Sequence, residues 1–455
     1  SVEKGFMREN IFSEFKLNDM SDENYSKIDL HKNIVDSIIL VSNSGKKMKR
    51  EEDLIDVWFD SGSMPYAQWH YPFENKENID SNKFYPADFI AEGVDQTRGW
   101  FYTLHAISTM VFDSVSYKNV ISNGLVLDKN GQKMSKRLGN AIDPFKTLSD
   151  YGPDATRWYM ISNSNPWDNL KFDINGVDEV KRKFFGTLYN TYSFFALYAN
   201  IDNFNYKENE IKFEEKPELD RWIISELNTL ISKVEKFYED YEPTKAAREI
   251  SDFVIDNLSN WYVRLSRRRF WKGEYELDKI SAYQTLFTVL VDICKISAPI
   301  SPFFMDKMFQ DLTRNVDGKF SESVHLESFP VSDTSKIDKD LQEKINYAQI
   351  ISSLTLSLRA KQKIKVRQPL NRILIPVDSV NKKNIINSVS EEIKRRLIHQ
   401  LKEAPSSRRL YRKKTRKKYS KKNIDKEIDR MPIKKAEKLY FEILEKHKPS
   451  KSSKK

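Results

Sequence analysis

The sequence predicts an α/β fold in which a parallel α/β domain is followed by a helical bundle. Between residues 51 and 175, short apolar runs that suit buried strands alternate with helical spacing. Between residues 177 and 314, apolar residues recur every three or four positions, which is typical of helices that bury one face. The chain has 455 residues, of which 39% are hydrophobic, so it is long enough for two or three packed domains.

The first predicted unit is a strand, a helix and a second strand. FYPADFIAEG at 84–93 predicts a buried strand, QTRGWFYTLHAISTMVF at 96–112 predicts a helix buried on most sides, and YKNVISNGLVLD at 117–128 predicts the next strand. This order is the crossover unit of a parallel sheet, whose ligands lie beyond the carboxyl ends of the strands. Glu92–Gln96 and Lys133–Arg137 both follow such ends.

The second half of the chain is predicted to be a helical bundle. One clear apolar stripe is closed by Pro243, and the short run ILIPV at 373–377 predicts a strand after the bundle. The stripe consists of Ile223, Leu227, Leu230, Ile231, Val234 and Phe237. We expect helices at 177–200, 219–240, 244–270, 280–296, 299–314 and 338–362.

The positive charge is concentrated in the tail. The chain has a net charge of +10, and residues 394–455 carry 24 Lys and Arg against 7 Asp and Glu. A cationic tail attracts polyanions such as RNA without sequence preference, whereas many such runs are only solvated or disordered. The abrupt start of this low-complexity segment is also compatible with an out-of-frame reading of an interrupted gene.

Several classes of protein and site are disfavoured by composition. No apolar stretch approaches the roughly 18 residues that a membrane span needs, and SVEKGFMREN is not a signal peptide. Cys294 is the single cysteine, so no internal disulfide or cysteine-bound zinc is possible, and the six histidines form no HxxxH or HExxH pair. We expect a soluble cytoplasmic protein without a metal site, and the initial Ser suggests a fragment or a trimmed product.

GQKMSKRLG at 131–139 is the candidate phosphate-binding loop. Its spacing alone favours an ordinary exposed turn. However, the loop follows a strand end, places Ser135 between two lysines, and precedes Asp143, which predicts a helix start. Lysine suits a migrating phosphate, and bracketing glycines let the backbone close over a ligand. No GxxxxGK[ST] or GxGxxG motif occurs, so a P-loop or a dinucleotide fold is unsupported.

KMSKR followed by LGN resembles the KMSKS signature of class I aminoacyl-tRNA synthetases. Four further segments are similar to the isoleucyl-tRNA synthetase family in particular: DVWFDSGS at 56–63, AEGVDQTRGWF at 91–101, YGPDATRWYMISNSNPWDNLKFD at 151–173 and NLSNWYVRLSRRRFWKG at 257–273. The likeness covers roughly residues 1–376. It implies the second half of a Rossmann-like catalytic domain, followed by an α-helical anticodon-binding domain and the basic tail.

The resemblance implies catalytic roles for three residues of the loop. Lys133 and Lys136 would steady the triphosphate of ATP while the amino acid carboxylate attacks the α-phosphorus, and Lys136 matches the lysine usually assigned to ATP. Ser135 would lend its hydroxyl to the same phosphates. These groups would stabilise charge that develops in the transition state, without a covalent enzyme intermediate.

The resemblance also assigns the segment EGVDQ to adenylate binding. Glu92, Gly93 and Asp95 match residues that hold the adenosine ribose and the adenylate, and Gln96 matches one that contacts the aminoacyl carbonyl. Carboxylates accept hydrogen bonds from ribose hydroxyls, and glycine permits a close backbone approach. The residues alone leave a second interpretation open, in which Glu92 caps a helix or forms an ion pair.

The remaining candidates are two tryptophans and four arginines. By resemblance, Trp58 and Trp100 would wall the isoleucine side chain, although tryptophans in apolar runs are more often core residues. The arginines would contact tRNA phosphates, although a basic helical face is usually only solvated. They are Arg264, Arg267, Arg268 and Arg269.

The likeness implies five parts of the chain. No HxGH motif occurs, so we expect the half-sheet that carries it in the family, and most of the editing domain, to be missing. The parts are the trailing end of the inserted editing or connective domain at 1–50, the C-terminal half of the catalytic domain at 51–175, the anticodon-binding domain at 176–370, the start of a truncated C-terminal domain at 371–393, and the basic tail, disordered or partly helical, at 394–455.

The resulting hypothesis is an isoleucine–tRNA ligase activity. ATP would activate isoleucine to isoleucyl-adenylate, and the aminoacyl group would pass to tRNA(Ile). Mg²⁺ is expected with ATP, whereas no zinc site, membrane or protein partner is evident. The alternatives are a catalytically incomplete tRNA-binding module or a non-functional remnant, and we expect little adenylate from these 455 residues alone because half of the phosphate clamp is absent.

Overall fold

The computed structural model divides the described chain into two compact units. The first consists of residues 1–186, 233–251 and 296–308, and the second of 187–232, 252–295 and the residues from 309 on. The predicted tail at 394–455 lies almost wholly outside the described residues, and so does the side chain of Lys136. The described residues are 1–397 except 20, 54–55, 273, 317, 367, 369–372, 392 and 395–396.

The N-terminal part of the first unit contains only short elements. Helices α1 (Asp22–Tyr25) and α2 (Lys32–Val35) precede an antiparallel pair, β1 (Ile39–Val41) and β2 (Lys47–Lys49). Gly45, with a φ of +79°, provides the left-handed turn between the two strands.

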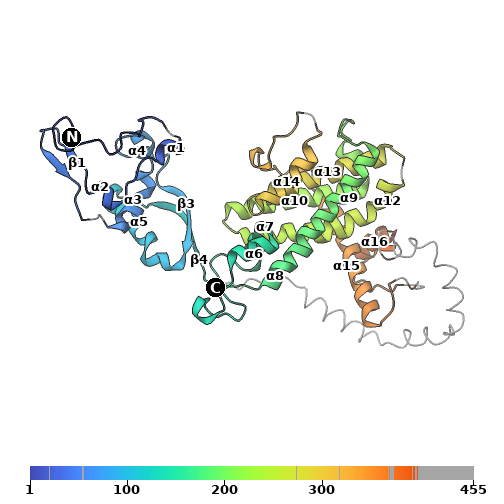
Figure 1. Cartoon of the computed structure of the whole chain (residues 1–455). Coiled ribbons are helices and arrows are strands. Elements are labelled where there is room, and N and C mark those ends of the chain that lie inside the picture. The colour runs from blue at the N-terminus through green and yellow to red at the C-terminus, as the bar shows by residue number, and fades with distance from the viewer. Residues whose placement is uncertain are drawn as a thin grey trace. The chain divides into compact units, whose positions relative to one another are not determined.

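The predicted order of strand, helix and strand is confirmed (Figure 1), but the second predicted strand, 117–128, ends at Asn123, and residues 126–127 form a strand of another sheet. β3 (Ala87–Gly93) pairs in parallel with β4 (Tyr117–Asn123), and α5 (Trp100–Phe112) connects them after the 3₁₀ turn η1 (Val94–Arg98). Ile90, Phe101 and Leu104 form the local core, with Ala87, Trp100 and Tyr117 packed against it.

Helix α3 (Val57–Ala67) packs closely on α5, and α4 (Lys76–Asp80) follows it. The close approach requires a glycine at position 62, because a Cβ there would lie 2.6 Å from Cδ1 of Ile107.

A second two-stranded parallel sheet carries the lysine-rich loop. β5 (Val126–Leu127) pairs with β6 (Leu170–Lys171), and η2 (Lys136–Leu138), α6 (Pro144–Tyr151) and α7 (Pro153–Asn163) lie between them in sequence. Gly124, just before β5, packs so closely on the neighbouring backbone that a Cβ there would lie 2.3 Å from the carbonyl oxygen of Asp168. Asp143 caps α6 by accepting hydrogen bonds from the N–H groups of Phe145 and Lys146, which confirms the predicted helix start.

Helices complete the first unit. α7 meets α8 (Ile174–Val180) and the π-helical turn η3 (Lys181–Phe185), where Trp158 stacks on Phe184 with ring centroids 4.1 Å apart. Trp158 also donates a 3.0 Å hydrogen bond to Ser251 of α11 (Pro243–Asp252). The first residues of α14 (Pro302–Thr313) join here, since the N–H of Phe304 donates to the buried carboxylate of Asp154.

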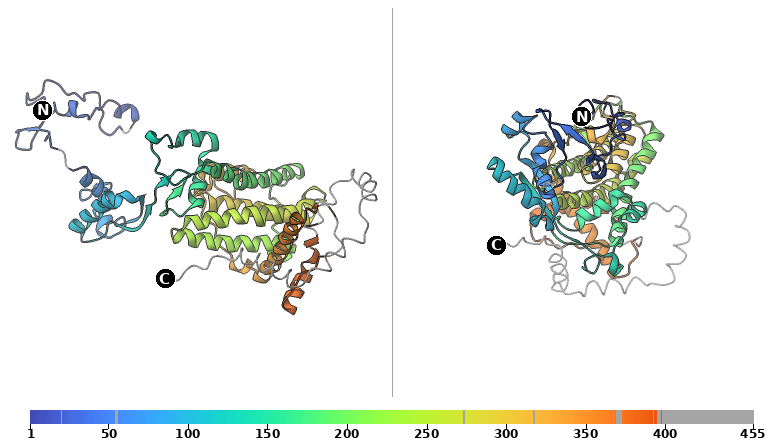
Figure 2. Two further views of the ribbon diagram at one scale, coloured as in Figure 1. Left: turned by 90° about the horizontal axis from the view of Figure 1, so that it is seen from below. Right: turned by 60° about the vertical axis from the view of Figure 1, so that its left-hand side comes forward.

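The second unit is helical. Helices α9 (Gly186–Asp202), α12 (Arg264–Trp271) and α13 (Leu277–Ser297) lie side by side (Figures 1 and 2), joined by ring contacts of Phe194 with Phe270 and of Phe195 with Tyr283. The other elements of the helical half are η4 (Phe213–Glu215), α10 (Glu218–Glu239), the π-helical η5 (Phe253–Val263), η6 (Val324–Leu326), η7 (Thr334–Lys336), α15 (Lys339–Lys361) and α16 (Val380–Ser388).

The six predicted helices are confirmed in position, but the predicted strand at 373–377 is wrong. These residues are described and form no strand. A short apolar run has no strand partner of its own, and ladder pairing rather than composition makes a strand. None of the helices in the described ranges is long and apolar enough to cross a membrane.

Candidate functional site

The first part of the candidate site lies at the carboxyl end of β3 and β4. The two strands end in register, because Glu92 pairs with Ser122 and Gly93 with Asn123. The carboxylates of Glu92 and Asp95 are exposed there. Both carboxylates therefore lie at or just beyond the end of a parallel strand, as the sequence predicts.

Gly93 leaves room for the carboxylate of Asp95 in its present position. A Cβ at position 93 would lie 2.6 Å from Oδ1 of Asp95, so a side chain would displace that carboxylate. Gln96 joins this turn to the next helix, since its Oε1 accepts a 2.9 Å hydrogen bond from the N–H of Trp100. Its Nε2 remains directed to the same turn and lies 3.4 Å from Oδ2 of Asp95.

The two candidate tryptophans have different surroundings. Trp58 is 48% exposed, in the first turn of α3, and Asp56 holds that turn by accepting a 2.7 Å hydrogen bond from its N–H. The ring of Trp58 lies against Gly99, where a Cβ would be only 3.0 Å from Cη2. Trp100 is half-buried against the local core, and its Nε1 donates to the carbonyl of Ser61 at 2.9 Å. Trp100 thus has a structural role of its own, whereas one face of Trp58 is available to solvent.

The second part of the site is the lysine loop, which is held by Asp128 and Asn140. Oδ1 of Asp128 accepts hydrogen bonds from the N–H groups of Asn130 and Gln132 at 2.9 and 2.8 Å. Its Oδ2 accepts from the side-chain amide of Asn140 at 3.0 Å. Asp128 is only 9% exposed, so one nearly buried carboxylate orders both ends of the loop.

Asn140 also reaches the centre of the loop. Its Nδ2 donates to the carbonyl of Lys133 at 3.2 Å, and its Oδ1 accepts from the N–H of Ser135 at 2.9 Å. The Oγ of Ser135 in turn accepts from the N–H of Leu138 at 3.2 Å. The backbone around the two lysines is therefore fixed by one amide side chain. Lys133 is exposed.

Hydrogen bonds keep Asp128 ionised. The N–H of Gln132 and the side-chain amide of Asn140 hold the pKa of this carboxyl below its ordinary value of 3.8, against a smaller opposing effect of desolvation. The sequence prediction did not include Asp128 or Asn140. The available signal was the DKNG turn before the loop and the asparagine of LGN after it.

The two parts of the site have no direct bond in the described portion of the chain. No hydrogen bond or ion pair joins Glu92 or Asp95 to Lys133 or Ser135 among those residues. The connection runs along the chain from the end of β4 through Gly124 into β5.

The four candidate arginines are also not equivalent. Arg269 is mostly buried, donates to the fully buried Asp220 at 2.8 Å from Nη2, and forms an ion pair with Asp278. Arg267 and Arg268 are exposed, and Arg264 is partly buried. The described residues contain no group of three potential metal ligands.

Two family descriptions match this chain. "tRNA synthetases class I (I, L, M and V)" matches residues 3–173, and "Anticodon-binding domain of tRNA ligase" matches residues 220–374.

Curated relatives are isoleucine–tRNA ligases. That of Bacteroides fragilis is 63% identical over 388 residues, 85% of this chain and 34% of the relative. Those of Bacteroides thetaiotaomicron and Clostridium novyi are 63% and 50% identical over 86% and 78% of this chain, and again 34% of the relatives. This chain therefore spans about a third of the length of the curated relatives that it matches.

A solved structure shares the fold. It is a LeuRS of Agrobacterium radiobacter K84 in a ternary complex with tRNA and LeuAMS, 18% identical, with a TM-score of 0.50 over 79% of this chain and 41% of that one.

Proposed function

From the premise that this chain belongs to the isoleucine–tRNA ligases, which are class I tRNA synthetases, we propose that it contributes the adenylate pocket, the lysine loop and tRNA-binding helices to that activity. The reaction would activate isoleucine with ATP to isoleucyl-adenylate and then transfer the aminoacyl group to tRNA(Ile). Mg²⁺ would enter with ATP as part of the substrate.

One observation carries the proposal. Glu92, Gly93 and Asp95 lie at or just after the joint carboxyl end of two parallel strands, and the partly exposed ring of Trp58 lies against Gly99, four residues after Asp95. Exposed carboxylates at this position can accept hydrogen bonds from the two ribose hydroxyls of an adenosine. Trp58 offers an apolar surface for a branched aliphatic side chain.

Both ends of the Gln96 amide form hydrogen bonds that orient it. Its Oε1 accepts from the N–H of Trp100, and its Nε2 donates to Oδ2 of Asp95 at 3.4 Å, which leaves the second N–H of Nε2 as a donor at the edge of the turn. A donor so oriented suits the carbonyl oxygen of an aminoacyl group.

The lysine loop would act on the phosphates. Because the Oγ of Ser135 accepts from the N–H of Leu138, its hydroxyl proton is left to donate to a phosphate oxygen. We assign Lys133 and Lys136 to the triphosphate, where ammonium groups offset the charge that gathers on departing pyrophosphate. Asn140 and Asp128 keep the backbone between these lysines ordered before ATP arrives.

Binding of a stable adenylate analogue tests the pocket. Isoleucyl-sulfamoyl adenosine should bind the full chain in calorimetric titration, and Asp95→Asn should weaken it about tenfold, because the neutral amide is a weaker acceptor. Asp88→Asn is the matched control, since Asp88 is an exposed carboxylate of β3, the strand that leads to Asp95, and is paired with Lys118. Equal affinities of wild type and Asp95→Asn, or tighter binding of the leucyl analogue, would contradict the assignment.

Catalysis is tested by isoleucine-dependent exchange of pyrophosphate into ATP. We expect a low rate from the 455 residues, because the sequence has no HxGH motif to complete the phosphate clamp. A robust rate would contradict that expectation, and its loss in Lys136→Ala would then assign the exchange to the lysine loop.

A second candidate function is tRNA binding without catalysis. The exposed Arg267 and Arg268 on α12 and the match to an anticodon-binding domain favour it. Binding of tRNA(Ile) should then persist without ATP or isoleucine, weaken steeply with salt, and fall on deletion of residues 394–455 or in Arg267→Gln with Arg268→Gln. Arg182→Gln, at an exposed arginine of η3, is the control. If the affinity for tRNA(Ile) changes neither with salt nor on the deletion, this function is rejected.

A further inference from the structure

Met134 of the lysine loop lines a pocket that has no role in the proposed reaction. Its walls come from β5, the lysine loop, the residues that lead into α6, α6 itself, α7, the residue after β6, and the start of α14, all in the first unit. Its volume is about 410 Å³. Most of its lining is apolar and includes Val126, Met134, Leu148, Met160, Phe172 and Phe303.

The pocket offers apolar surface that is partly open to solvent. Met160 is 37% exposed and Phe303 is 62% exposed, although both line the hollow. Two polar residues of the lining are already satisfied, because the hydroxyls of Thr147 and Thr156 each donate to a helix carbonyl at 2.9 Å. A hollow of a few hundred Å³ with mostly apolar walls and few polar groups is the usual form of a small-molecule site.

Among the described side chains, Arg157 is the charged residue of the lining. Its Nη1 lies 3.8 Å from Oδ1 of Asp154, which is longer than a hydrogen bond, and its guanidinium lies over the ring of Phe303 at 5.5 Å. In the described part of the chain these are its polar and ring contacts, so most of its five N–H donors face solvent or the pocket.

We propose that this pocket binds a small organic anion with an aromatic or branched hydrocarbon body. The hydrocarbon would cover Met160, Phe172 and Phe303, and the carboxylate or sulfonate would pair with Arg157. A planar guanidinium suits such a head group because it can donate two parallel hydrogen bonds to it.

Occupancy of this pocket would restrain the lysine loop. Met134 lies between Lys133 and Ser135 and forms one wall of the pocket. A ligand that packs against Met134 binds better when the loop is in the described position, so it shifts the loop toward that position. The site is therefore an effector site for the loop, separate from Glu92 and Asp95.

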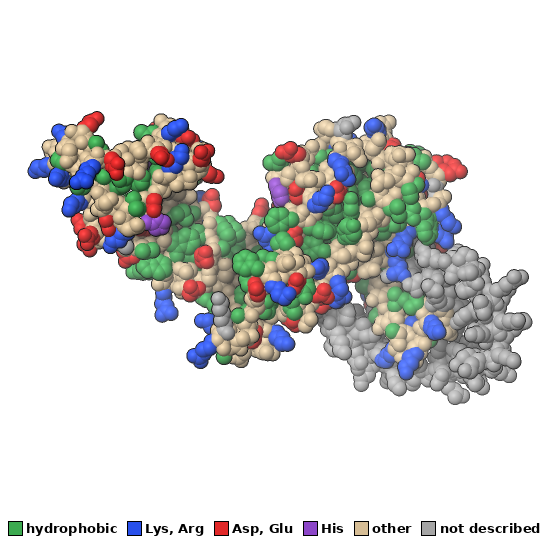
Figure 3. All heavy atoms as spheres, viewed as in Figure 1, with side chains coloured by type: hydrophobic (Ala, Val, Ile, Leu, Met, Phe, Trp, Pro, Cys, Tyr) green, Lys and Arg blue, Asp and Glu red, His purple; other side chains and the backbone are tan. Residues whose placement is uncertain are grey.

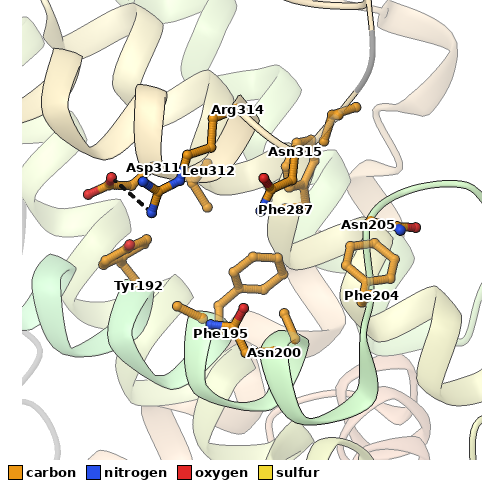
Figure 4. A pocket seen from close by; sticks show the side chains of 13 residues that line it. Tyr192, Phe195, Asn200, Phe204, Asn205, Phe287, Asp311, Leu312, Arg314 and Asn315 are labelled. Carbon is orange, nitrogen blue, oxygen red and sulfur yellow. Dashed lines mark ion pairs between the residues drawn. The ribbon is translucent and has the colours of Figure 1, made fainter.

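A second pocket, which is smaller, does not support a comparable proposal. It lies in the second unit between α9 and the end of α14, where Phe195, Phe204 and Phe287 face the Arg314–Asp311 ion pair (Figure 4). Its volume is about 90 Å³, less than a quarter of the first. It does, however, provide a matched control, because Arg314 and Asp311 have the same three-residue spacing as Arg157 and Asp154.

The probe for the test is 1-anilinonaphthalene-8-sulfonate, which joins an aromatic body to one anionic group. Titration of the full chain should show one saturable site, and Arg157→Gln and Met160→Trp should each weaken it about tenfold, by loss of the charge and by filling of the space. Arg157→Lys should recover part of the affinity, and Arg314→Gln should leave it unchanged. Neutral N-phenyl-1-naphthylamine should bind more weakly than the sulfonate.

The loop provides a second readout in the same samples. At saturating dye, trypsin cleavage after Lys133, Lys136 and Arg137 should slow about threefold or more, while cleavage after the exposed Lys27 in the same digest should not change. Circular dichroism of each variant checks that it is folded. The proposal is overturned if all variants bind the dye alike, if the neutral probe binds as tightly, or if bound dye leaves loop cleavage unchanged.

Discussion

The β3–α5–β4 segment and the helices of the second unit use apolar residues differently. In the helical unit, Tyr262, Leu286 and Ile293 are fully buried. In the β3–α5–β4 segment, Phe89 and Val120 of the sheet are 41% and 46% exposed, and Figure 3 shows hydrophobic side chains gathered on the surface over β3 and β4. The same contrast holds for polar groups, since Asp220 is fully buried and paired whereas Glu92 and Asp95 face solvent.

The difference in burial corresponds to a difference in role between the helical unit and the β3–α5–β4 segment. Parallel sheets are normally covered on both faces, but in the described residues α5 covers one face of β3 and β4, and the stacking of Phe89 on Tyr241 covers little of the other. The helical unit is therefore stabilised by its own buried core. The β3–α5–β4 segment, which carries Glu92 and Asp95, instead has apolar surface exposed to solvent. Substitutions in the two regions should differ accordingly.

Loss of Asp220 should have the largest effect. This carboxylate accepts hydrogen bonds from Tyr262, Arg269 and Ser281. Asp220→Ala would leave the guanidinium of Arg269 buried without this partner and should lower the free energy of unfolding by about 4 kcal/mol, measured by urea titration.

The control for this effect is Asp278, the exposed partner of the same arginine. Asp278→Ala should lower the free energy of unfolding by less than about 1 kcal/mol, because the Asp278 carboxylate is exposed and Arg269 keeps Asp220 as its buried partner. Equal losses of unfolding free energy in the two variants would show that the buried hydrogen bonds of Asp220 stabilise the helical unit no more than the exposed ion pair does.

The buried carboxyl of Asp292 destabilises the helical unit when it is ionised. Burial raises the pKa of Asp292 to about 6, although Lys295 and Lys336 oppose the shift. The unfolded carboxyl has its ordinary pKa near 3.9, so between about pH 4 and pH 6 the unfolded state releases this proton first and folding weakens as pH rises. Asp292→Asn should therefore stabilise the chain by about 3 kcal/mol at pH 7, since each pKa unit corresponds to about 1.4 kcal/mol, and have no effect at pH 3.5. Thermal unfolding at both pH values checks this, and the same gain at both would contradict it.

A matched pair of valines measures the contrast directly. Val289 of α13 is fully buried, whereas Val120 of β4 is 46% exposed. Val289→Ala should lower the free energy of unfolding by about 2 kcal/mol, by lost burial and a residual cavity. Val120→Ala should change it by less than about 0.5 kcal/mol. If the two losses agree, surface exposure does not distinguish the regions.

Asn140 should have the smallest effect on stability but a clear local one. Asn140→Ala removes the amide that joins Asp128, Lys133 and Ser135, so we expect a loss of about 1 kcal/mol and several-fold faster trypsin cleavage of the loop. Asn130→Ala, at an exposed side chain in the preceding turn, is the control. Unchanged cleavage in Asn140→Ala would mean that the loop is ordered by other contacts.

Local patterns account for the parts of the fold that were predicted. The stripe from Ile223 to Phe237 predicts α10, and Asp143 before Pro144 predicts the start of α6, because periodicity and capping depend on residues within one or two turns. The motif EGVDQ was placed at a strand end for the same reason. The run at 373–377 failed as a strand because strand formation depends on a partner far away in sequence.

The sequence by itself therefore determined the helices, the crossover of β3 and β4, and the family. Only the tertiary structure decided how individual side chains are used. It buries Arg269 against Asp220, 49 positions away, packs Trp100 into a core while leaving Trp58 exposed, and brings Asn140 back to Asp128. Local spacing cannot specify these pairings, because they depend on where the folded backbone returns and on which polar groups it removes from water.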